Sequence, residues 1–219
     1  MKTEDYGWQE APPNSSAYLE PVILRLAKSY GARSVLDAGC GNGYLAERLS
    51  GAGFEVTAVD GDVTGVRIAR DRAPQVNFQI GLFEDEPPGV FDFVSSTEVV
   101  EHLYSPHVLV RYCFDALKPG GILAMSTPYH GYLKNLALSI FDKWDDHHTV
   151  HWHGGHIKFW SRKTLTKLLS DAGFEVIAFH GVGRLPFLWK SMVLVGRKPL
   201  DTEAAAPPPE QPHRGLRND

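Results

Sequence analysis

Glycines and two acidic residues give the first third of the chain its most specific chemical signal. The segment Asp37-Ala38-Gly39-Cys40-Gly41-Asn42-Gly43 follows a short apolar run, and Asp60 ends the next one. Glycines at such a turn let the backbone approach a ligand closely, because no Cβ atoms stand in the way. A carboxylate about 20 residues further on can accept hydrogen bonds from both hydroxyls of a ribose. The spacing predicts a nucleoside site at the end of the first strand.

The spacing of the glycines also discriminates between nucleosides. A dinucleotide fingerprint needs a third small residue two positions after Asn42, where this chain has Tyr44. The loop is instead Gly-x-Gly-x-Gly, with Asp37 in front of it. An acidic residue there repels a pyrophosphate and attracts the cationic amino group of S-adenosylmethionine. The sequence therefore favours S-adenosylmethionine over a nicotinamide cofactor, and the lysine-bearing phosphate loop is absent.

A second set of reactive side chains follows the predicted fourth strand. Glu98, Glu101 and His102 are spaced i, i+3 and i+4, so a helical turn would place them on one face. His102 could accept a proton from a hydroxyl nucleophile, because its unperturbed pKa of about 6.5 suits neutral pH. Alternatively, Glu98, Glu101 and His102 brace the loop by hydrogen bonds. Both interpretations stay open.

Five histidines lie within the ten residues from His147 to His156. One interpretation is a catalytic base presented to the substrate, with His151, His153 and His156 as candidates. A second is a zinc or iron site, although spacing this dense does not identify the three ligands. The third is a structural network of the histidines with Trp152.

Composition excludes several classes of protein. The chain has 219 residues, with 22 Lys and Arg against 26 Asp and Glu, so it has no excess positive charge for a nucleic-acid partner. Its two cysteines, Cys40 and Cys113, suit a reducing compartment. No apolar run reaches the roughly 18 residues of a membrane span, and the first residues lack the form of a signal peptide. We expect a cytoplasmic protein acting on a small molecule; its oligomeric state stays open.

Alternating periodicities define the elements that position these groups. Helices are expected at 18–30, 44–49, 63–72, 106–117 and 161–172, and strands at 34–37, 55–60, 76–80, 91–95, 122–126, 174–179 and 187–195. This alternation predicts an α/β fold with a seven-stranded, mostly parallel sheet and one antiparallel strand at its end. We divide the chain into an N-terminal arm (1–16), one domain (17–199) with a cap insertion (129–160), and a disordered tail (200–219).

The insertion carries an apolar stripe at helical spacing, and we expect this stripe to pack on the domain. Its members are Leu133, Leu136, Ala137, Ile140, Phe141 and Trp144. A lid over an apolar substrate, or peripheral contact with a membrane, stays open as an alternative. Near the end of the chain, Phe187 and Trp189 are expected in the core, whereas Arg184 and Lys190 could pair with an acidic substrate group.

Five segments in this order resemble class I S-adenosylmethionine-dependent methyltransferases over roughly residues 30–127. They are Asp37-Ala38-Gly39-Cys40-Gly41-Asn42-Gly43, Val59-Asp60, Phe91-Asp92-Phe93-Val94, Glu98-Val99-Val100-Glu101-His102-Leu103 and Leu117-Lys118-Pro119-Gly120-Gly121. The resemblance implies a Rossmann-like methyltransferase fold with S-adenosyl-L-methionine as cofactor.

The resemblance also assigns cofactor contacts residue by residue. It implies that Asp37 and the loop from Gly39 through Cys40 and Gly41 to Gly43 hold the methionine portion. Asp60, with Gly61 beside it, would bind the ribose hydroxyls, and Thr97 would line the cofactor. Family members often have an acidic residue after the third strand that binds the adenine amino group. Here Gly81-Leu82-Phe83 stands in its place, so Phe83 would offer its backbone amide and ring to adenine.

Within the class, the chain looks closest to ubiquinone-biosynthesis O-methyltransferases. The similarity lies in Glu98-Val99-Val100-Glu101-His102, Ser126-Thr127-Pro128 and Lys134-Asn135-Leu136. It implies methylation of a hydroxyl oxygen, and in that branch the Glu-x-x-Glu-His motif is thought to hold Mg²⁺. Because histidine is an unusual ligand for Mg²⁺, we keep this ion as a possibility and assign no metal ligand. The alternatives are N- or C-methylation of another metabolite, or a non-catalytic cofactor-binding protein of the same fold.

Overall fold

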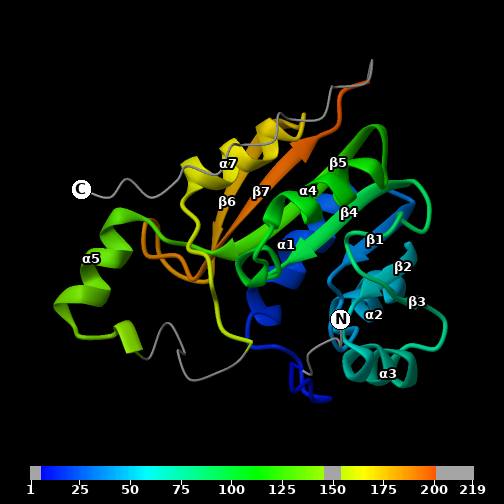
Figure 1. The fold of residues 1–219 in the computed structure, drawn as a ribbon, viewed down its shortest axis with the longest axis horizontal. Helices are drawn as coiled ribbons and strands as arrows, with labels where there is room; N and C mark the ends of the chain where they lie inside the picture. Colours follow the sequence, from blue (N-terminus) through cyan, green and yellow to red (C-terminus); the bar gives the residue numbers. More distant parts are fainter. Residues whose placement is uncertain (1–5, 146–153, 201–219) are drawn as a thin grey trace, which may run out of the picture.

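Short apolar runs that end in glycine or a polar residue form the strands of one central sheet. The computed structural model describes residues 6–145 and 154–200. The strands lie in the order β3-β2-β1-β4-β5-β7-β6 (Figure 1). Their bounds are β1 (Ser34–Ala38), β2 (Glu55–Asp60), β3 (Asn77–Ile80), β4 (Phe91–Thr97), β5 (Leu117–Pro128), β6 (Glu175–Val182) and β7 (Ser191–Arg197).

The directions of the strands confirm the predicted fold class. β1 pairs in parallel with β2 and β4, β2 with β3, and β4 with β5. β7 is antiparallel to both of its neighbours, β5 and β6. The antiparallel strand is therefore the last along the chain but lies one place in from the edge of the sheet.

Helices connect the strands where the 3.6-residue period predicts them. They are α1 (Ser16–Ser29), α2 (Tyr44–Gly51), α3 (Val63–Arg72), α4 (Pro106–Asp115), α5 (Tyr132–Ile140) and α7 (Arg162–Asp171), with a short 3₁₀ turn, η1 (Val100–His102). The Asp62 side chain caps α3 by accepting the Gly65 N–H at 2.9 Å. Ser161 and Thr164 form a capping box at the start of α7.

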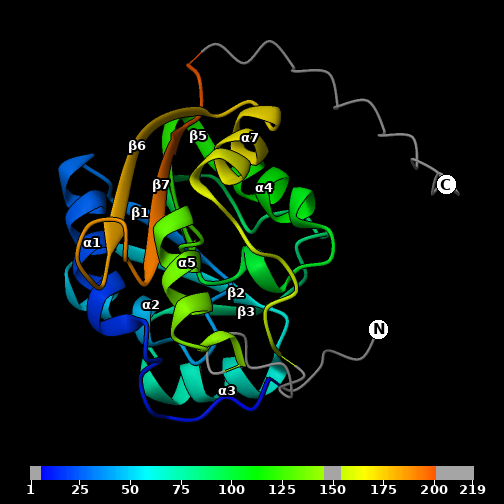
Figure 2. The same cartoon turned by 90° about the vertical axis from the view of Figure 1, so that its left-hand side faces the viewer.

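Helices cover both faces of the sheet (Figure 2). Alternate strand residues point to opposite faces, so Val35 packs with α1, α2 and α3, whereas Leu36 packs with α4 and α7. The parallel strands direct their carboxyl ends to one edge. At that edge Asp37 lies opposite Ala58 of β2 and Ser95 of β4, so side chains from the ends of three strands lie close together.

The Lys118-Pro119-Gly120-Gly121 segment belongs to β5, although the sequence predicted a helix to residue 117 and a strand only from 122. α4 ends at Asp115. Gly120 donates its N–H to Lys198 at 2.9 Å, and Lys198 returns a bond to Gly121 at 2.9 Å. These long-range backbone bonds extend the strand.

The prediction that the apolar stripe of the insertion packs on the domain is wrong. α5 projects from the body (Figure 1), and Leu133, Leu136, Ile140, Phe141 and Trp144 are exposed. The buried residue of this helix is Lys134, whose Nζ donates to the Lys190 carbonyl at 3.2 Å. That polar anchor turns the apolar side of the helix away from the sheet.

The loop between β6 and β7 also departs from expectation. Phe187, expected in the core, is exposed and has a positive φ of 65°. Trp189 is partly buried and packs edge-on against Tyr129, with ring centroids 5.1 Å apart. Within the described residues, no helix is long and apolar enough to cross a membrane.

Candidate cofactor and substrate site

The glycine loop folds over the end of β2. The N–H groups of Gly39 and Cys40 donate to the Val59 carbonyl at 2.8 and 3.1 Å. Gly39 and Gly41 have φ values of 85° and 51°, a left-handed conformation that favours glycine. A Cβ atom at Gly39 would lie 2.4 Å from a Val99 methyl, so the loop also needs glycine to fit beside the chain after β4.

Asp37 is buried at the end of β1 with one carboxylate oxygen unpartnered. Oδ1 accepts a bond from the Ser95 hydroxyl at 2.8 Å. Oδ2 has no hydrogen-bond partner among the described residues. Burial raises the pKa of Asp37 to about 7, against the lowering effect of Ser95. A ligand cation that reached Oδ2 would supply the missing partner.

Asp60 is held by backbone amides of the loops around it. Its Oδ2 accepts the Gly41 N–H at 2.7 Å, and its Oδ1 accepts the Asp62 N–H at 2.8 Å. Burial raises the pKa of Asp60, and these amide bonds lower it. A carboxylate has about four lone-pair sites, so two bonds fix its orientation and leave acceptor capacity for a diol.

The other predicted cofactor residues lie around the same edge. Gly61 follows β2 directly, Thr97 ends β4, and Phe83 follows β3 with its ring 5.3 Å from that of Tyr112. Cys40 is a buried free thiol, and burial raises its pKa well above the usual value. Direct cofactor contact by each of these residues remains a prediction.

Gly43 has a packing reason to be glycine. A Cβ atom there would lie 2.5 Å from the Cβ of Ala69 and 3.0 Å from the Phe78 ring. Its φ of 74° is also left-handed. The third loop glycine thus lets α2 begin close to α3.

Sequence reasoning missed the contribution of the N-terminal arm to this site. The Trp8 ring lies over the glycine loop, because a Cβ atom at Gly41 would be 2.3 Å from it and one at Gly65 would be 2.8 Å from it. Tyr6 donates its N–H to Asp62 at 2.8 Å. The sequence feature that could have indicated this contact is Trp8, a large aromatic side chain in a mostly polar segment.

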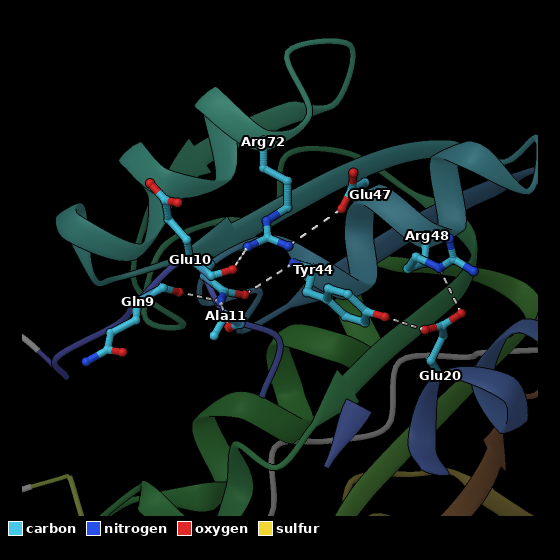
Figure 3. Close-up of polar contacts among 9 residues, drawn as sticks. Gln9, Glu10, Ala11, Glu20, Tyr44, Glu47, Arg48 and Arg72 are labelled. Atoms are coloured by element: carbon cyan, nitrogen blue, oxygen red, sulfur yellow. Dashed lines mark hydrogen bonds and ion pairs between the residues drawn. The ribbon is translucent and has the colours of Figure 1, made fainter. Parts of the chain in front are cut away.

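Two side chains from the loop and α3 hold the arm in place (Figure 3). Asn42, in the middle of the glycine loop, donates to the carbonyls of Gln9 and Ala11 at 2.7 and 2.9 Å. Arg72 donates to the Glu10 carbonyl and forms an ion pair with Glu47 at 3.6 Å. Asn42, between two loop glycines, therefore holds the arm against the loop.

Glu98, which directly follows β4, forms hydrogen bonds with residues of β5 and β7. It has a left-handed backbone, with φ of 55°, and lies outside the turn that the sequence predicted for it. Its carboxylate accepts the Ser126 hydroxyl at 2.8 Å and the Ser191 hydroxyl at 3.0 Å. Burial raises the pKa of Glu98 to about 7, against the effects of these hydroxyls and of the Lys134 charge.

Glu101 and His102 lie in η1, and the insertion brings His156 beside them. The Glu101 side chain is fully buried, and neither carboxylate oxygen has a hydrogen-bond partner among the described residues. His102 Nε2 lies 4.0 Å from Glu101 Oε1, and the His102 and His156 ring centroids are 4.9 Å apart. Burial lowers the pKa of His102, so its neutral form is favoured.

The Mg²⁺ ligand set implied by the resemblance is not brought together as a whole among the described residues. Each oxygen of Glu98 accepts one serine hydroxyl, and Glu98 is not among the three residues whose ligand atoms lie close together. One ligand atom each from Glu101, His102 and His156 lies within 4.8 Å of the others. Of the predicted catalytic histidines, the structure brings His102 and His156 together, whereas His151 and His153 lie outside the described residues.

Comparisons with known proteins agree with this geometry. A family model described as a methyltransferase domain matches residues 14–178. A probable S-adenosylmethionine-dependent methyltransferase of Mycobacterium tuberculosis is 34% identical over 200 residues, covering 86% of this chain and 68% of that protein. A ubiquinone biosynthesis O-methyltransferase of Xanthomonas campestris is 42% identical over 116 residues, covering 50% of this chain and 48% of the relative. The chain thus spans about half to two thirds of these relatives.

The fold has close counterparts among solved structures. Magnesium protoporphyrin IX methyltransferase from Synechocystis, solved with S-adenosylhomocysteine, aligns with a TM-score of 0.64, 18% identity and coverage of 82% of each chain. At that identity the likeness concerns the fold alone. The family model and the mycobacterial relative carry the assignment: the chain belongs to the family of S-adenosylmethionine-dependent methyltransferases.

Proposed function

We propose that this chain binds S-adenosylmethionine at the carboxyl ends of β1, β2 and β4 and transfers its methyl group to a hydroxyl oxygen of a small molecule. The observation that carries the proposal is the pair of carboxylates at the ends of β1 and β2, of which Asp37 is buried and Asp60 is partly buried. Asp37 has an unpartnered Oδ2, and Asp60 is oriented by loop amides. S-adenosylmethionine carries a cationic amino group for the first and a ribose diol for the second.

The preference for oxygen is supported by the relatives named as ubiquinone biosynthesis O-methyltransferases. It is also consistent with the acceptor side of the site. A hydroxyl nucleophile has to lose a proton. After β4, His102 lies beside the buried Glu101, and because burial lowers the pKa of His102, its imidazole favours the neutral form that can accept a proton. An amine acceptor does not need a base to the same extent.

The reaction is a single displacement. The acceptor oxygen forms a bond to the methyl carbon while the carbon–sulfur bond breaks, and the electron pair of that bond stays on sulfur to give S-adenosylhomocysteine. Holding donor and acceptor in line is the main contribution of the protein. The hydroxyl proton goes to a general base, for which His102, His151, His153 and His156 are the predicted candidates.

The test uses the full chain with S-adenosylmethionine that carries ¹³C in its methyl group, incubated with a bacterial small-molecule extract. We expect a new methoxyl signal, with S-adenosylhomocysteine formed in equal amount. The ¹³C shift separates a methoxyl from an N-methyl or C-methyl group. A signal of either other type would replace this proposal by N- or C-methylation. Binding of S-adenosylhomocysteine without any turnover would favour a non-catalytic protein.

A further inference from the structure

The buried amine of Lys134 is an unusual feature of the segment after β5. Lys134 is 7% exposed and is the buried residue of α5, whereas Leu133, Leu136 and Ile140 of the same helix are exposed. An ammonium group is costly to bury, and inside proteins it is normally paired or fully hydrogen-bonded. The partners of this amine therefore indicate what it does.

The described partners of Lys134 use only part of its hydrogen-bonding capacity. Its Nζ donates to the Lys190 carbonyl at 3.2 Å, whereas an ammonium group has three N–H donors. Among the described residues Lys134 forms no ion pair. Burial lowers the pKa of Lys134 to about 8, against the raising effect of the Glu98 charge, so the amine is still mostly charged at neutral pH. Two of its donors are left for a ligand.

Two further cations come from the β6–β7 loop. α5 and this loop lie side by side (Figure 1, Figure 2), and the bond from Lys134 to the Lys190 carbonyl joins them. The Arg184 charge lowers the pKa of both Lys134 and Tyr18, so the guanidinium lies near both groups. Lys190 places its Nζ 5.4 Å from the centre of the Tyr18 ring. Arg184 forms no hydrogen bond or ion pair with another described residue.

These cations lie on the acceptor side of the predicted cofactor site. The Tyr18 and Ser191 hydroxyls are 3.3 Å apart, and Ser191 donates to Glu98 at 3.0 Å. Glu98 directly follows β4, whose carboxyl end borders the proposed position of S-adenosylmethionine. A molecule held by Lys134 and Arg184 would therefore lie next to the cofactor.

The acidic groups nearby do not pair with these cations. The charges of Glu98 and Glu101 act on Tyr18. The two oxygens of Glu98 accept serine hydroxyls, and among the described residues neither carboxyl group forms an ion pair with a lysine or an arginine. The donors of the cations thus remain available, although the whole chain has a net charge of −4. Ammonium and guanidinium groups are the usual protein partners of carboxylates and phosphates.

We propose that Lys134 and Arg184 bind an anionic group of the methyl acceptor, so that the acceptor is a small hydroxylated molecule with a carboxylate or phosphate group. This inference rests on the proposed function, because it names the class of acceptor for the same site. Lys134 supplies donors from α5, and Arg184 supplies them from the β6–β7 loop. The anion would thus connect these two segments when the acceptor binds.

The test divides the bacterial small-molecule extract on an anion-exchange resin at neutral pH. Each fraction is then incubated with the full chain and S-adenosylmethionine, and S-adenosylhomocysteine formation is measured. We expect methyl transfer with the retained, anionic fraction and none with the unretained fraction, which contains neutral and cationic molecules.

Variants assign the anion to the two residues. Lys134→Met and Arg184→Gln should each lower transfer at least tenfold when the retained fraction is limiting, because each loses a charged donor. Transfer should recover when more of this fraction is added, since KM rather than kcat changes. Lys167→Met is the matched control, because Lys167 is exposed on α7 and pairs with Asp171, and it should act as the unmodified chain does. Melting temperatures and S-adenosylhomocysteine calorimetry show whether each variant is folded.

Transfer with the unretained fraction would overturn this inference and leave methyl transfer itself established. If that transfer appeared only after inorganic phosphate was added, the cations would bind a free anion, which also contradicts the proposal. Unchanged transfer in Arg184→Gln would contradict it as well, and a loss in Lys134→Met alone would mean that the amine only fastens α5. No transfer with either fraction would instead contradict the proposed function, and this inference with it.

Discussion

Asp60 and Asp37 show how carboxylates at strand ends can be kept ready for a ligand. Asp37 is buried and Asp60 is partly buried, and each has only part of its acceptor capacity used by described protein groups. The glycine loop supplies amide donors to Asp60, and a serine of the neighbouring strand supplies one hydroxyl to Asp37. The remaining capacity is what a ribose diol and an ammonium group would use.

Replacing Asp60 by alanine should weaken S-adenosylhomocysteine binding by about tenfold or more, because a charged hydrogen-bond acceptor contributes roughly 1.5–3 kcal/mol. Calorimetry on the full chain measures this. Asp92→Ala is the matched control, since Asp92 binds Ser34 and Lys118 near the start of β4, away from the glycine loop. Equal affinities for the unmodified chain and Asp60→Ala would refute the ribose contact.

The raised pKa of Asp37, about 7, makes cofactor binding depend on pH. Below this pKa the free protein carries a protonated Asp37, whereas a ligand ammonium group favours the ionised form. Affinity should therefore rise by up to roughly tenfold per pH unit as the pH increases towards 7, and level off above it. Calorimetry at about pH 5.5 to about 7.5 in two buffers should show proton release on binding at the lower pH.

Asp37→Asn serves as the control for that pH dependence. It removes the titrating group, so its affinity should be weaker and nearly constant over the same range. If the unmodified chain showed the same flat profile, Asp37 would not be the group that meets the ligand cation.

The N-terminal arm and α5 represent two kinds of element whose position depends on distant contacts. The arm follows no helical or strand period, and it is placed by Asn42 and Arg72 through main-chain carbonyls (Figure 3). α5 has a clear helical period, but its position depends on the buried amine of Lys134.

Trp8→Ala should weaken S-adenosylhomocysteine binding by about 1 kcal/mol, or roughly fivefold, because the ring covers the glycine loop. Trp144→Ala is the control, since Trp144 follows the projecting α5. Calorimetry on both variants measures the difference. An equal effect of the two substitutions would mean that the arm plays no part in holding the cofactor.

The exposure of α5 predicts a contrast in stability between two apolar residues. Ile140→Glu should change the free energy of unfolding by no more than about 0.5 kcal/mol, because Ile140 is 67% exposed. Leu169→Ala in α7 should lower it by about 2–5 kcal/mol, because Leu169 is fully buried. Urea denaturation of both variants tests this. A large loss in Ile140→Glu would show that the stripe packs on the body after all.

Local patterns predicted the strands and helices because the period of the apolar residues shows which face of each element is buried. They failed where a contact with a distant part of the chain determines the position of an element. The stripe on α5 identifies an apolar face but does not show whether another segment covers it. The exposure of Phe187 depends on how the β6–β7 loop turns. The position of His156 beside His102 likewise depends on a long-range contact, in which the N–H groups of Ile157 and Lys158 donate to the Glu101 carbonyl.

At the scale of the molecule, the order of the strands determines where the candidate site residues lie close together. The chain runs outward through β1, β2 and β3 and then returns to place β4 on the other side of β1. Open α/β sheets bind ligands at such a reversal, beyond the carboxyl ends of the strands. The glycine loop, Asp60 and the chain after β4 all lie at this reversal, so their grouping could be predicted from the order of motifs alone.

The same view explains why the acceptor side is harder to predict than the cofactor side. Cofactor residues follow parallel strands whose positions are fixed by the sheet. The segments predicted to border the acceptor, the insertion and the β6–β7 loop, are instead placed by single side-chain contacts such as that of Lys134 with the Lys190 carbonyl.

The most direct test of the cofactor assignment is calorimetry of the full chain with S-adenosylhomocysteine and, separately, with NAD. We predict one S-adenosylhomocysteine site of micromolar affinity and no measurable binding of NAD, because the site offers carboxylates for an ammonium group and a diol and lacks the small residue that a pyrophosphate needs at Tyr44. Tighter binding of NAD, or binding of neither ligand, would contradict the account.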